Sequence, residues 1–409
     1  MLRTRNITSF SIAFVIMIRL LSVVALSGFQ SNLLNFLFLS ILFITTVFCL
    51  LLNYKQLSKS TNRLLFAFLV FVILMYFLHN MIGEAQITIL ELLLYCMIPL
   101  ILSILNFDAE LVLRYILYLS LSSIPVIDRI LEYEYVSLQQ VDMAVAYALF
   151  VGVSACIIHF LFYRNRKNIL IYFSYIYNIY VLIRLVFVGN RGIYLSFAAL
   201  ILFFQITYIR GQEFSKKKKR ALKCVLIFEL IAFFIVINNL NSIVLEVYNS
   251  LIGSGKDVPS FFIKMRRQIL SGDVSNGRAS GYLDLIGLIF KNPFGYGMES
   301  TYRITNGIYA YPHNFFLQFW IEFGIIFGTI FNIITCLPIY VWLSKKINST
   351  KYEKNFLLFL IVITIPKMFV SGDIWMQPQF WFLFGIGMYY CSTLFCSRKI
   401  KYSSRISYK

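Results

Sequence analysis

Apolar runs of about twenty residues follow one another along almost the whole chain, and they restrict its fold more than any other feature. A helix needs roughly 20 apolar residues to cross the hydrocarbon core of a bilayer, which is about 30 Å thick. Hydrophobic residues make up 59% of the 409 residues and charged residues only 13%. A soluble domain carries about 25% charged residues. The sequence therefore predicts an integral membrane protein and excludes a soluble globular, disordered or collagenous chain.

Twelve segments are apolar enough to be predicted as transmembrane helices, which gives an all-α polytopic fold in a single transmembrane domain, residues 1–409. The tenth segment is long and contains Pro338, so we expect it to be tilted or kinked. The first is too long for a cleaved signal peptide, and we expect it to stay in the membrane. The predicted spans are Ile7–Phe29, Ser31–Leu52, Leu64–Ile82, Ile87–Leu105, Leu111–Ile127, Met143–Tyr163, Ile169–Val188, Ile193–Ile209, Cys224–Ile243, Asn314–Trp342, Phe356–Val370 and Phe380–Phe395.

Lysine and arginine are unevenly distributed between the two sets of loops that connect these spans. With a cytoplasmic N-terminus, the predicted cytoplasmic segments hold 24 of the 37 basic residues, whereas the short loops on the opposite face hold two, Arg129 and Arg191. Cytoplasmic loops of membrane proteins carry such an excess of basic residues. The bias predicts that both termini are cytoplasmic. Because it also accounts for the net charge of +19, we do not expect nucleic-acid binding.

One connection, residues 244–313 between spans nine and ten, is far longer than the others, and the predicted orientation places it on the outer face. An amphipathic helix is predicted over residues 260–270, because its apolar residues can share one face. A second helix is predicted from about Arg278 to Phe290, and it ends at residues 292–297, where one proline and two glycines force turns. This loop is the only part outside the spans large enough to form a site, so we expect the site there.

Several charged residues fall inside or beside the predicted spans, where they are costly and usually face a cavity or a partner. Arg184 lies about one turn inside the outer end of span seven, Glu322 about two turns into span ten, and Lys367 in the outer half of span eleven. For Arg184 and Glu322, a structural pair and a substrate-binding role both stay open. Arg191, in the outer turn after span seven, is a stronger functional candidate. Arg19 is interpreted as structural.

Two residues of the long loop could carry chemistry. Arg278 follows Asn276-Gly277 at a predicted helix start, where an anion such as a diphosphate would meet free backbone N–H groups, the helix dipole and a guanidinium together. His313 stands between Pro312 and Asn314, where the loop enters span ten, and a neutral imidazole there could accept a proton from a sugar hydroxyl. The alternatives are a solvated arginine at a helix start and a histidine packed at the membrane interface.

Taken together, these motifs resemble the O-antigen polymerase (Wzy-type) and O-antigen ligase family. The resemblance extends over about Arg184 to Gly328, and it includes the twelve-span plan with a large outer loop between spans nine and ten. The motifs, in the order of the family, are Asn190-Arg191-Gly192 before a span, Gly277-Arg278 at a helix start, Asn292-Pro293-Phe294-Gly295-Tyr296-Gly297, and Pro312-His313-Asn314-Phe315-Phe316-Leu317 followed by Glu322-Phe323-Gly324.

The resemblance implies a polymerase of lipid-linked oligosaccharide repeats, for O-antigen, capsule or exopolysaccharide, at the outer face of a bacterial cytoplasmic membrane. It implies an undecaprenyl-diphosphate-linked donor, and a chain-length regulator and a flippase as further partners. Carried over by motif, Arg191 and Arg278 would hold the diphosphate and His313 would activate or orient the acceptor hydroxyl. Arginines can neutralise a leaving diphosphate without a metal, so we expect neither a metal ion nor another cofactor.

Three further residues complete the predicted substrate-binding set. Arg184 and Glu322 enter it through their positions inside the spans, and Arg303 enters it as a basic residue of the long loop that no motif supports. These residues would lie on the same outer face as Arg191 and His313. We therefore expect them to contact the lipid-linked oligosaccharide. The sequence supports this expectation less than it supports the roles of Arg191, Arg278 and His313.

Other functions stay open. A ligase of the same family would move finished polymer onto a lipid core or another acceptor. A transporter or flippase also has many spans, but one built as two six-span halves often has a long central loop, and spans six and seven are joined here only by residues 164–168. Glycosyltransferases with a polyprenyl monophosphate donor typically carry an acidic residue in the first outer loop. In this chain the first outer loop is only a residue or two near Gln30, and it contains no acidic residue.

Overall fold

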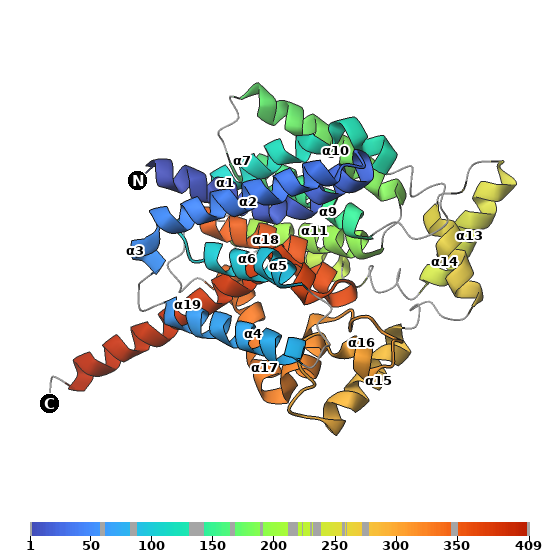
Figure 1. Cartoon of the computed structure of the whole chain (residues 1–409). Helices are drawn as coiled ribbons and strands as arrows, with labels where there is room; N and C mark the ends of the chain where they lie inside the picture. The colour runs from blue at the N-terminus through green and yellow to red at the C-terminus, as the bar shows by residue number, and fades with distance from the viewer. Residues whose placement is uncertain are drawn as a thin grey trace.

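The computed structural model describes residues 2–57, 62–81, 88–130, 143–163, 168–188, 191–211, 220–222, 224–229, 231, 239–255, 258, 260–271, 278–344 and 351–406. Every regular element within these ranges is a helix (Figure 1). Backbone groups in a bilayer must be hydrogen-bonded within the protein, and a helix does this within a single segment. The predicted all-α class is confirmed.

The helices follow the predicted apolar segments closely, with local departures into π- and 3₁₀-helical turns. Those of the main bundle are α1 (Leu2–Val23), η1 (Val24–Gly28), α2 (Asn32–Leu52), α3 (Tyr54–Leu57), α4 (Arg63–Met81), α5 (Ile89–Leu92), η3 (Leu93–Met97), α6 (Ile98–Leu102), α7 (Ala109–Ser120), η4 (Leu121–Val126), α9 (Met143–Phe162), α10 (Ile169–Val188), α11 (Arg191–Gly211), α17 (Phe315–Leu343), α18 (Lys351–Val370), η5 (Ile374–Met376) and α19 (Pro378–Ile406).

Six helical segments in the described residues are long and apolar enough to cross a membrane, which identifies a multi-pass membrane protein. Three shorter apolar helices accompany them, within α4, α5–α6 and α10. The centre of the predicted ninth span, residues 232–238, lies outside the described residues. The count of twelve spans therefore stays a prediction.

The long connection contains the two helices that the sequence predicts, and their bounds agree closely. The amphipathic stretch is α14 (Ser260–Leu270), and the second helix is α15 (Arg278–Lys291). The connection also contains the short α16 (Thr301–Ile304) and most of α13 (Leu240–Gly253), which begins within the predicted ninth span and packs against α14. Figure 1 shows α13 to α16 at one end of the bundle, here called the loop end, while both chain termini lie at the other end.

The tenth predicted span is α17, and it is broken at a different residue from the one expected. The non-helical angles fall at Gly324, with φ 77° and ψ 174°, and not at Pro338. Glycine has no Cβ and adopts a positive φ at little cost, so the chain can leave and re-enter the helix there. The break divides α17 into a short piece at the loop end and a longer piece that continues to Leu343.

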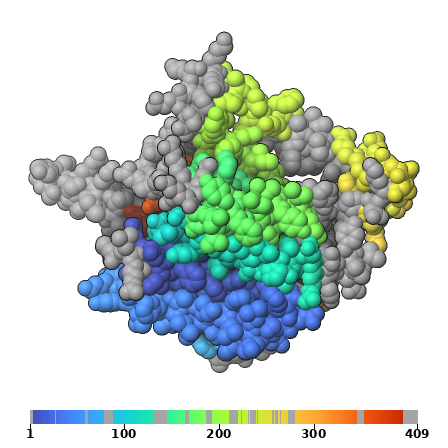
Figure 2. Space-filling model, turned by 90° about the horizontal axis from the view of Figure 1, so that it is seen from above, coloured from blue at the N-terminus to red at the C-terminus, as the bar shows by residue number. Residues whose placement is uncertain are grey.

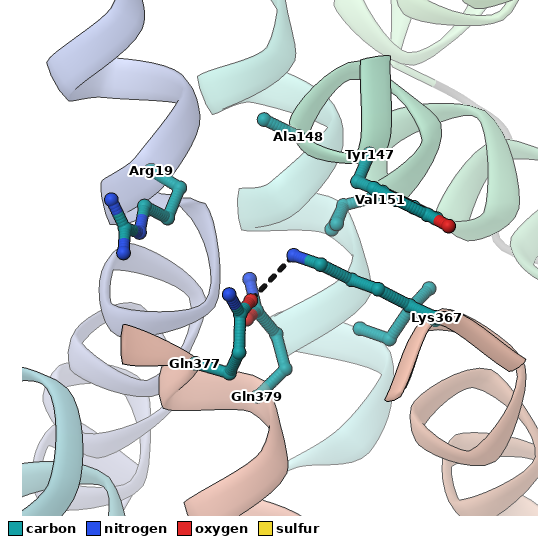
Figure 3. Close-up of a pocket in the computed structure, with 8 residues that line it drawn as sticks. Arg19, Tyr147, Ala148, Val151, Lys367, Gln377 and Gln379 are labelled. Carbon is teal, nitrogen blue, oxygen red and sulfur yellow. Dashed lines mark hydrogen bonds between the residues drawn. The ribbon is translucent and has the colours of Figure 1, made fainter. Parts of the chain in front are cut away.

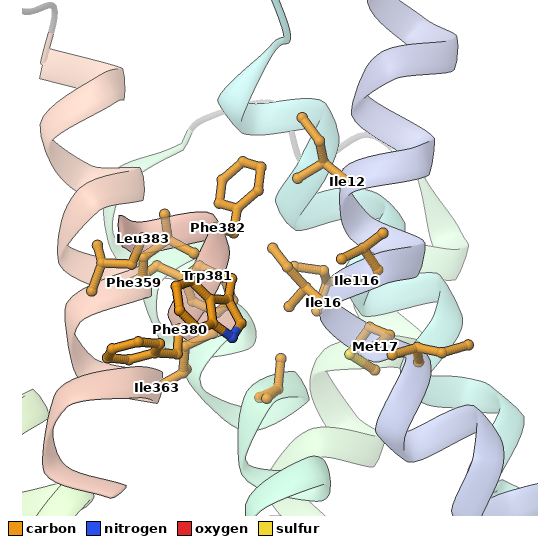
Figure 4. Packing of buried hydrophobic residues seen from close by; sticks show 14 of the residues in the cluster. Ile12, Ile16, Met17, Ile116, Phe359, Ile363, Phe380, Trp381, Phe382 and Leu383 are labelled. Carbon is orange, nitrogen blue, oxygen red and sulfur yellow. The ribbon is translucent and has the colours of Figure 1, made fainter. Parts of the chain in front are cut away.

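The core is built around α1, which contacts α2, α6, α7, α9 and α19. Figure 4 shows Ile16 and Met17 of α1 opposite Trp381 and Phe382 of α19, with Phe359 of α18 beside them. All five side chains are buried. Trp381 also packs edge-on against Phe380, with ring centroids 5.4 Å apart, and such aromatic pairs add about 0.5–1.5 kcal/mol beyond the area that they bury. In Figure 2, α2 lies on the surface of the bundle, and α13 and α14 are seen at one end.

Candidate functional site

His313 lies at the loop end, immediately before α17, in a backbone conformation that few residues adopt. Its φ is 56°, in the left-handed region. Non-glycine residues in that region are uncommon and cluster at active sites, where the surrounding structure holds them. Asn314 caps α17 by accepting hydrogen bonds from the backbone N–H groups of Phe316 (2.9 Å) and Leu317 (3.4 Å). The cap fixes the end of the helix, and so fixes the point from which His313 projects.

Two aromatic side chains hold His313 from the loop. The ring of Tyr311 lies 4.3 Å from the imidazole ring, centroid to centroid. The hydroxyl of Tyr282, on α15, donates to the backbone carbonyl of His313 at 3.4 Å. Since α15 begins at Arg278, this hydrogen bond joins the helix of one predicted site residue to the backbone of another.

The turn that ends α15 is joined to the break in α17 by backbone hydrogen bonds. We call this pairing of residues 293–297 with residues 321–325 the clasp. Main-chain groups make the bonds, so the pairing does not depend on particular side chains. The bonds run from the N–H of Tyr296 to the carbonyl of Ile321 (2.7 Å), from Gly297 to Glu322 (3.1 Å) and from Ile325 to Pro293 (2.8 Å).

Two glycines make the clasp possible. Gly295 has φ 90° and Gly324 has φ 77°. A Cβ on Gly295 would lie 2.5 Å from the backbone nitrogen of Gly324, and a Cβ on Gly324 would lie 2.5 Å from the carbonyl oxygen of Pro293. Backbone cannot move away as a flexible side chain can. The sequence motifs at residues 292–297 and 322–324 are therefore the two halves of one contact.

Glu322 lies in the protein interior and not at the surface, with 1% of its area exposed. Its two carboxylate oxygens accept hydrogen bonds from Nε2 of Gln318 (2.9 Å) and from Nε1 of Trp375 (2.8 Å). Arg184 and Glu322 are thus not a pair with each other. Glu322 instead joins α17 to the segment between α18 and α19.

Gln318 connects Glu322 to a second carboxylate, that of the half-buried Asp373. Its Nε2 also donates to Asp373 at 2.6 Å, and its Oε1 accepts from the backbone N–H of Ile374 at 3.2 Å. Burial raises the pKa of Asp373, and the hydrogen bond from Gln318 opposes that rise. The sequence analysis did not include Gln318, Asp373 or Trp375 in the site. Only Gln318 could have been suspected from the sequence, because it lies one helical turn before Glu322, a charged residue inside a predicted span.

Arg184 and Arg303 lie in more exposed places. Arg184 donates through Nη1 to Asp128 at 2.7 Å and to the hydroxyl of Tyr180 at 2.9 Å. Arg303, on α16, donates to the backbone carbonyl of Tyr296 at 3.1 Å, so it is attached to the clasp. Both guanidinium groups retain exposed area through which they can meet a ligand.

Arg191 and Arg278 are the first residues of α11 and α15. The first N–H groups of a helix have no partner within the helix, and together with the helix dipole they favour an anion. The start of α15 at Arg278 agrees with the predicted bound. The side chains of both arginines, and residues 189–190 and 272–277 before them, lie outside what the structure describes.

Within the described part of the chain, the structure shows no group of three or more His, Cys, Asp or Glu side chains placed to hold a metal ion. Among the described residues predicted for the site, the groups available for chemistry are the imidazole of His313, the guanidinium groups of Arg184 and Arg303, and the starts of α11 and α15. An arrangement of this kind can bind an anion, move a proton and neutralise a leaving group.

A helical bundle with an elaborated loop end and buried polar residues beneath it defines a multi-pass membrane protein with a candidate site at one face. The family model described as O-Antigen ligase matches residues 176–333, from α10 to α17. The match supports the resemblance of the motifs to the O-antigen ligase and polymerase family. All six predicted site residues lie inside the matched segment. A search of curated proteins found no match.

Proposed function

We propose that the protein is a glycosyltransferase that polymerises lipid-linked oligosaccharide repeat units. It transfers glycan from undecaprenyl diphosphate to an acceptor sugar hydroxyl at the outer face of a bacterial cytoplasmic membrane. The observation that carries the proposal is the single structural unit formed by α15, the clasp and the start of α17. This unit holds Arg278 and His313 inside the segment that matches the family.

The proposed topology has twelve spans, cytoplasmic termini and residues 244–313 on the outer face. The distribution of basic residues supports it, and so does the position of both chain ends opposite the loop end (Figure 1). Reporter fusions after Lys219 and after Lys346 should report the cytoplasm, and a fusion near Asn276 should report the outer face. A cytoplasmic signal near Asn276 would overturn both the orientation and the function.

In the proposed reaction, the acceptor oxygen attacks C1 of the donor sugar while the bond from C1 to the diphosphate oxygen breaks. The electron pair leaves with the diphosphate, whose growing charge is neutralised by Arg191 and Arg278 and by the N-termini of α11 and α15. The proton of the acceptor hydroxyl passes to the imidazole of His313. A positioned base of this kind contributes about 10²–10⁴-fold in rate.

The remaining residues support this reaction in different ways. We assign Arg184 and Arg303 to substrate binding, because both guanidinium groups are partly exposed at or near the loop end. Glu322 acts as a positioning residue, since its hydrogen bonds to Gln318 and Trp375 hold the short piece of α17 that follows His313. A flippase that supplies the donor and a regulator of chain length are the proposed protein partners.

Separate measurements of donor binding and of transfer test the roles of the two main residues. In nanodiscs, His313→Ala should keep affinity for the undecaprenyl diphosphate donor but lose single-turnover transfer about 10²-fold or more. Arg278→Ala should weaken both. Lys291→Ala, at the other end of α15, is the matched control and should change neither. Normal transfer by His313→Ala would reduce the histidine to a packing role.

A ligase is the second candidate, because the matching family model carries that description. Deletion of the chain from its host, followed by glycan analysis, separates the two functions. Loss of a ladder of repeats, with single repeats still attached to their carrier or core, indicates a polymerase. Full-length polymer that stays on undecaprenyl diphosphate indicates a ligase. Repeats that accumulate on the cytoplasmic side would instead indicate a flippase.

A further inference from the structure

The two cations that line a small cavity inside the bundle are bonded to other groups of the protein. Figure 3 shows this cavity, where Lys367 of α18 donates to the side-chain oxygen of Gln377. Arg19 of α1 donates to the backbone carbonyl of Met376 at 2.8 Å. The outer surface of α15 presents the opposite case, because large apolar side chains are exposed there. A partner outside the chain is needed to cover that surface.

One side of α15 packs on the short piece of α17. Leu285 and Ile289 form a small buried cluster with Leu317 and Ile321. Residues four apart lie on the same face of a helix, so Leu285 and Ile289 define the side of α15 that faces the bundle. In a helix surrounded by water, the opposite side would carry polar residues.

The opposite side of α15 is nevertheless apolar. Leu283 is 72% exposed, Phe290 73% and Ile286 38%. Their spacing of i, i+3 and i+7 places them in one stripe along the helix, here called the α15 stripe. A Cβ on Gly287, in the same stripe, would meet open space. A contiguous exposed apolar surface of this kind marks a site that contacts a membrane or another protein.

The α15 stripe has a charged edge. Asp284 and Lys291 are both exposed, and because they lie seven residues apart they follow one line along the helix, beside the stripe. A helix that lies in the membrane interface has this pattern: its apolar side enters the boundary of the hydrocarbon, and its charged residues stay in water. The edge therefore favours a lipid surface as the partner.

The stripe also continues into a surface that faces lipid. Phe294, in the clasp, is 86% exposed, and Ile326, just beyond the break in α17, is 69% exposed. The hydrogen bond of the clasp from Ile325 to Pro293 holds their backbones next to each other. Ile326 begins the exposed side of a helix that is long and apolar enough to cross a membrane, a side that Ile333 continues at 61%. The lipid around α17 therefore reaches Phe294, which follows the stripe directly in the chain.

We propose that the α15 stripe and Phe294 bind the lipid of the leaflet at the loop end, so that α15 is an interfacial helix of the membrane. Figure 1 shows α15 beside α17, whereas α13 and α14 project farther from the end that holds the termini. Arg278 lies five residues before Leu283, about 7 Å along the helix. The start of α15 then lies near the level of the lipid headgroups. The lipid contact itself does not depend on the proposed function.

Photocrosslinking tests this contact without a measurement of activity. The full chain carries p-benzoylphenylalanine at Phe290, at Asp284 or at Leu33, one position at a time, in nanodiscs of phosphatidylcholine. After irradiation, mass spectrometry should find lipid adducts at Phe290 in a yield similar to that at Leu33, which is 70% exposed on α2. The yield at Asp284, the matched control on the charged edge, should be about 10-fold lower, because an interfacial helix keeps only its apolar side in hydrocarbon.

Three results of this experiment would overturn the proposal. A covalent dimer formed from Phe290 would assign the α15 stripe to a second copy of the chain. No lipid adduct at Phe290, with adducts at Leu33, would place the stripe in water. Equal yields at Phe290 and Asp284 would show that the contact is not confined to the apolar side of the helix.

Replacement by glutamine provides a second measurement. Phe290→Gln in the same nanodiscs should lower the ratio of folded to unfolded protein about 10-fold, because a large apolar side chain loses its lipid contact. Asp284→Gln is the control and should leave the ratio unchanged. An unchanged ratio for Phe290→Gln would contradict the lipid contact.

The proposed donor site can fail separately from the lipid contact. If Phe290 forms lipid adducts while Arg278→Ala binds the undecaprenyl diphosphate donor as the wild type does, the α15 stripe stands and the donor site fails. If Phe290 forms no lipid adduct while Arg278→Ala weakens donor binding, the donor site stands and the interfacial position of α15 fails.

Discussion

The first two helices are equally apolar but occupy opposite positions in the bundle. The span at residues 4–26 has a mean hydropathy of 2.3, and the span at residues 32–52 has 2.4. Yet 72% of the first span is buried inside the protein, compared with 17% of the second. Hydropathy therefore identifies both as membrane helices without saying which one is central.

Polar side chains separate the two helices better than hydropathy does. In α1, Ser9 and Ser11 are fully buried, and they bond to the backbone of Asp108 and to the thiol of Cys49. In α2, Leu33 is 70% exposed, toward lipid. A polar group inside the hydrocarbon region needs a protein partner; Ser9 and Ser11 of α1 find theirs on other segments, whereas Thr45 of α2 bonds to carbonyls of its own helix. The same substitution should therefore change the stability of the protein much more in the interior of the bundle than at its surface.

The largest difference is expected between two glycines. Gly324→Ala places a Cβ against backbone atoms at a positive φ and should destabilise the protein by about 3 kcal/mol or more, with loss of transfer activity. Gly287→Ala, on α15, has open space around it and should be neutral or stabilising by up to about 1 kcal/mol. Thermal unfolding of the purified variants measures both. Equal melting temperatures would show that the clasp does not depend on Gly324.

Truncation of a leucine should show the contrast between α1 and α2 directly. Leu21→Ala removes a side chain that is 1% exposed and should cost about 2–4 kcal/mol, because it leaves a cavity. Leu33→Ala, in α2, should cost less than about 0.5 kcal/mol, since lipid fills the space. The check is the midpoint of denaturant-induced unfolding in mixed micelles. A large loss with Leu33→Ala would mean that α2 packs against a partner.

Two tryptophan hydrogen bonds provide a smaller contrast. Trp375→Phe leaves an oxygen of the buried Glu322 without its donor and should cost about 1–3 kcal/mol. Trp320→Phe removes a bond to the exposed hydroxyl of Thr329, which can bond instead to a carbonyl of its own helix, so the cost should stay below about 1 kcal/mol. Unfolding followed by tryptophan fluorescence of the remaining residues measures both variants. An equal loss of stability in the two variants would show that the buried position of Trp375 does not strengthen its hydrogen bond.

The smallest effect belongs to the exposed ion pair. Asp128 is 57% exposed and Arg184 34%, so water screens their 2.7 Å contact. Asp128→Asn should change stability by at most about 1 kcal/mol, and less still at high salt. Melting temperatures at low and high ionic strength test this expectation. A loss of several kcal/mol that salt does not reduce would place the pair in a drier environment than the structure gives it.

Features set by neighbouring residues could be predicted from the sequence, whereas features set by distant ones could not. The bounds of α14 and α15 follow from local periodicity and from the proline and glycines after residue 291. The clasp joins two short motifs through main-chain atoms, which leave no periodic pattern. The partner of Gln318 in the segment 373–374 lies 55 residues away in the chain, and no local pattern indicates it.

The predicted site shows the same limit. The motifs placed Arg278 at a helix start, and α15 begins there, whereas Arg191, predicted in the turn before span eight, is the first residue of α11. The sequence also suggested a kink at Pro338, but helix-interior prolines are tolerated when neighbouring segments supply the lost bond, and the break fell at Gly324. Glu322 was correctly recognised as unusual, but whether it faces a ligand or the interior depends on Trp375, which no spacing rule connects to it.

The clasp also bears on how such a protein can change during evolution. It closes residues 298–320 into a ring whose two ends are fastened by main-chain hydrogen bonds. The fastening needs Gly295 and Gly324 but is indifferent to most side chains inside the ring. Substitutions within residues 299–311 can therefore change the exposed surface of the ring without releasing its ends. Under the proposed function, a segment anchored in this way could change to recognise new glycans while the residues of the reaction stay the same.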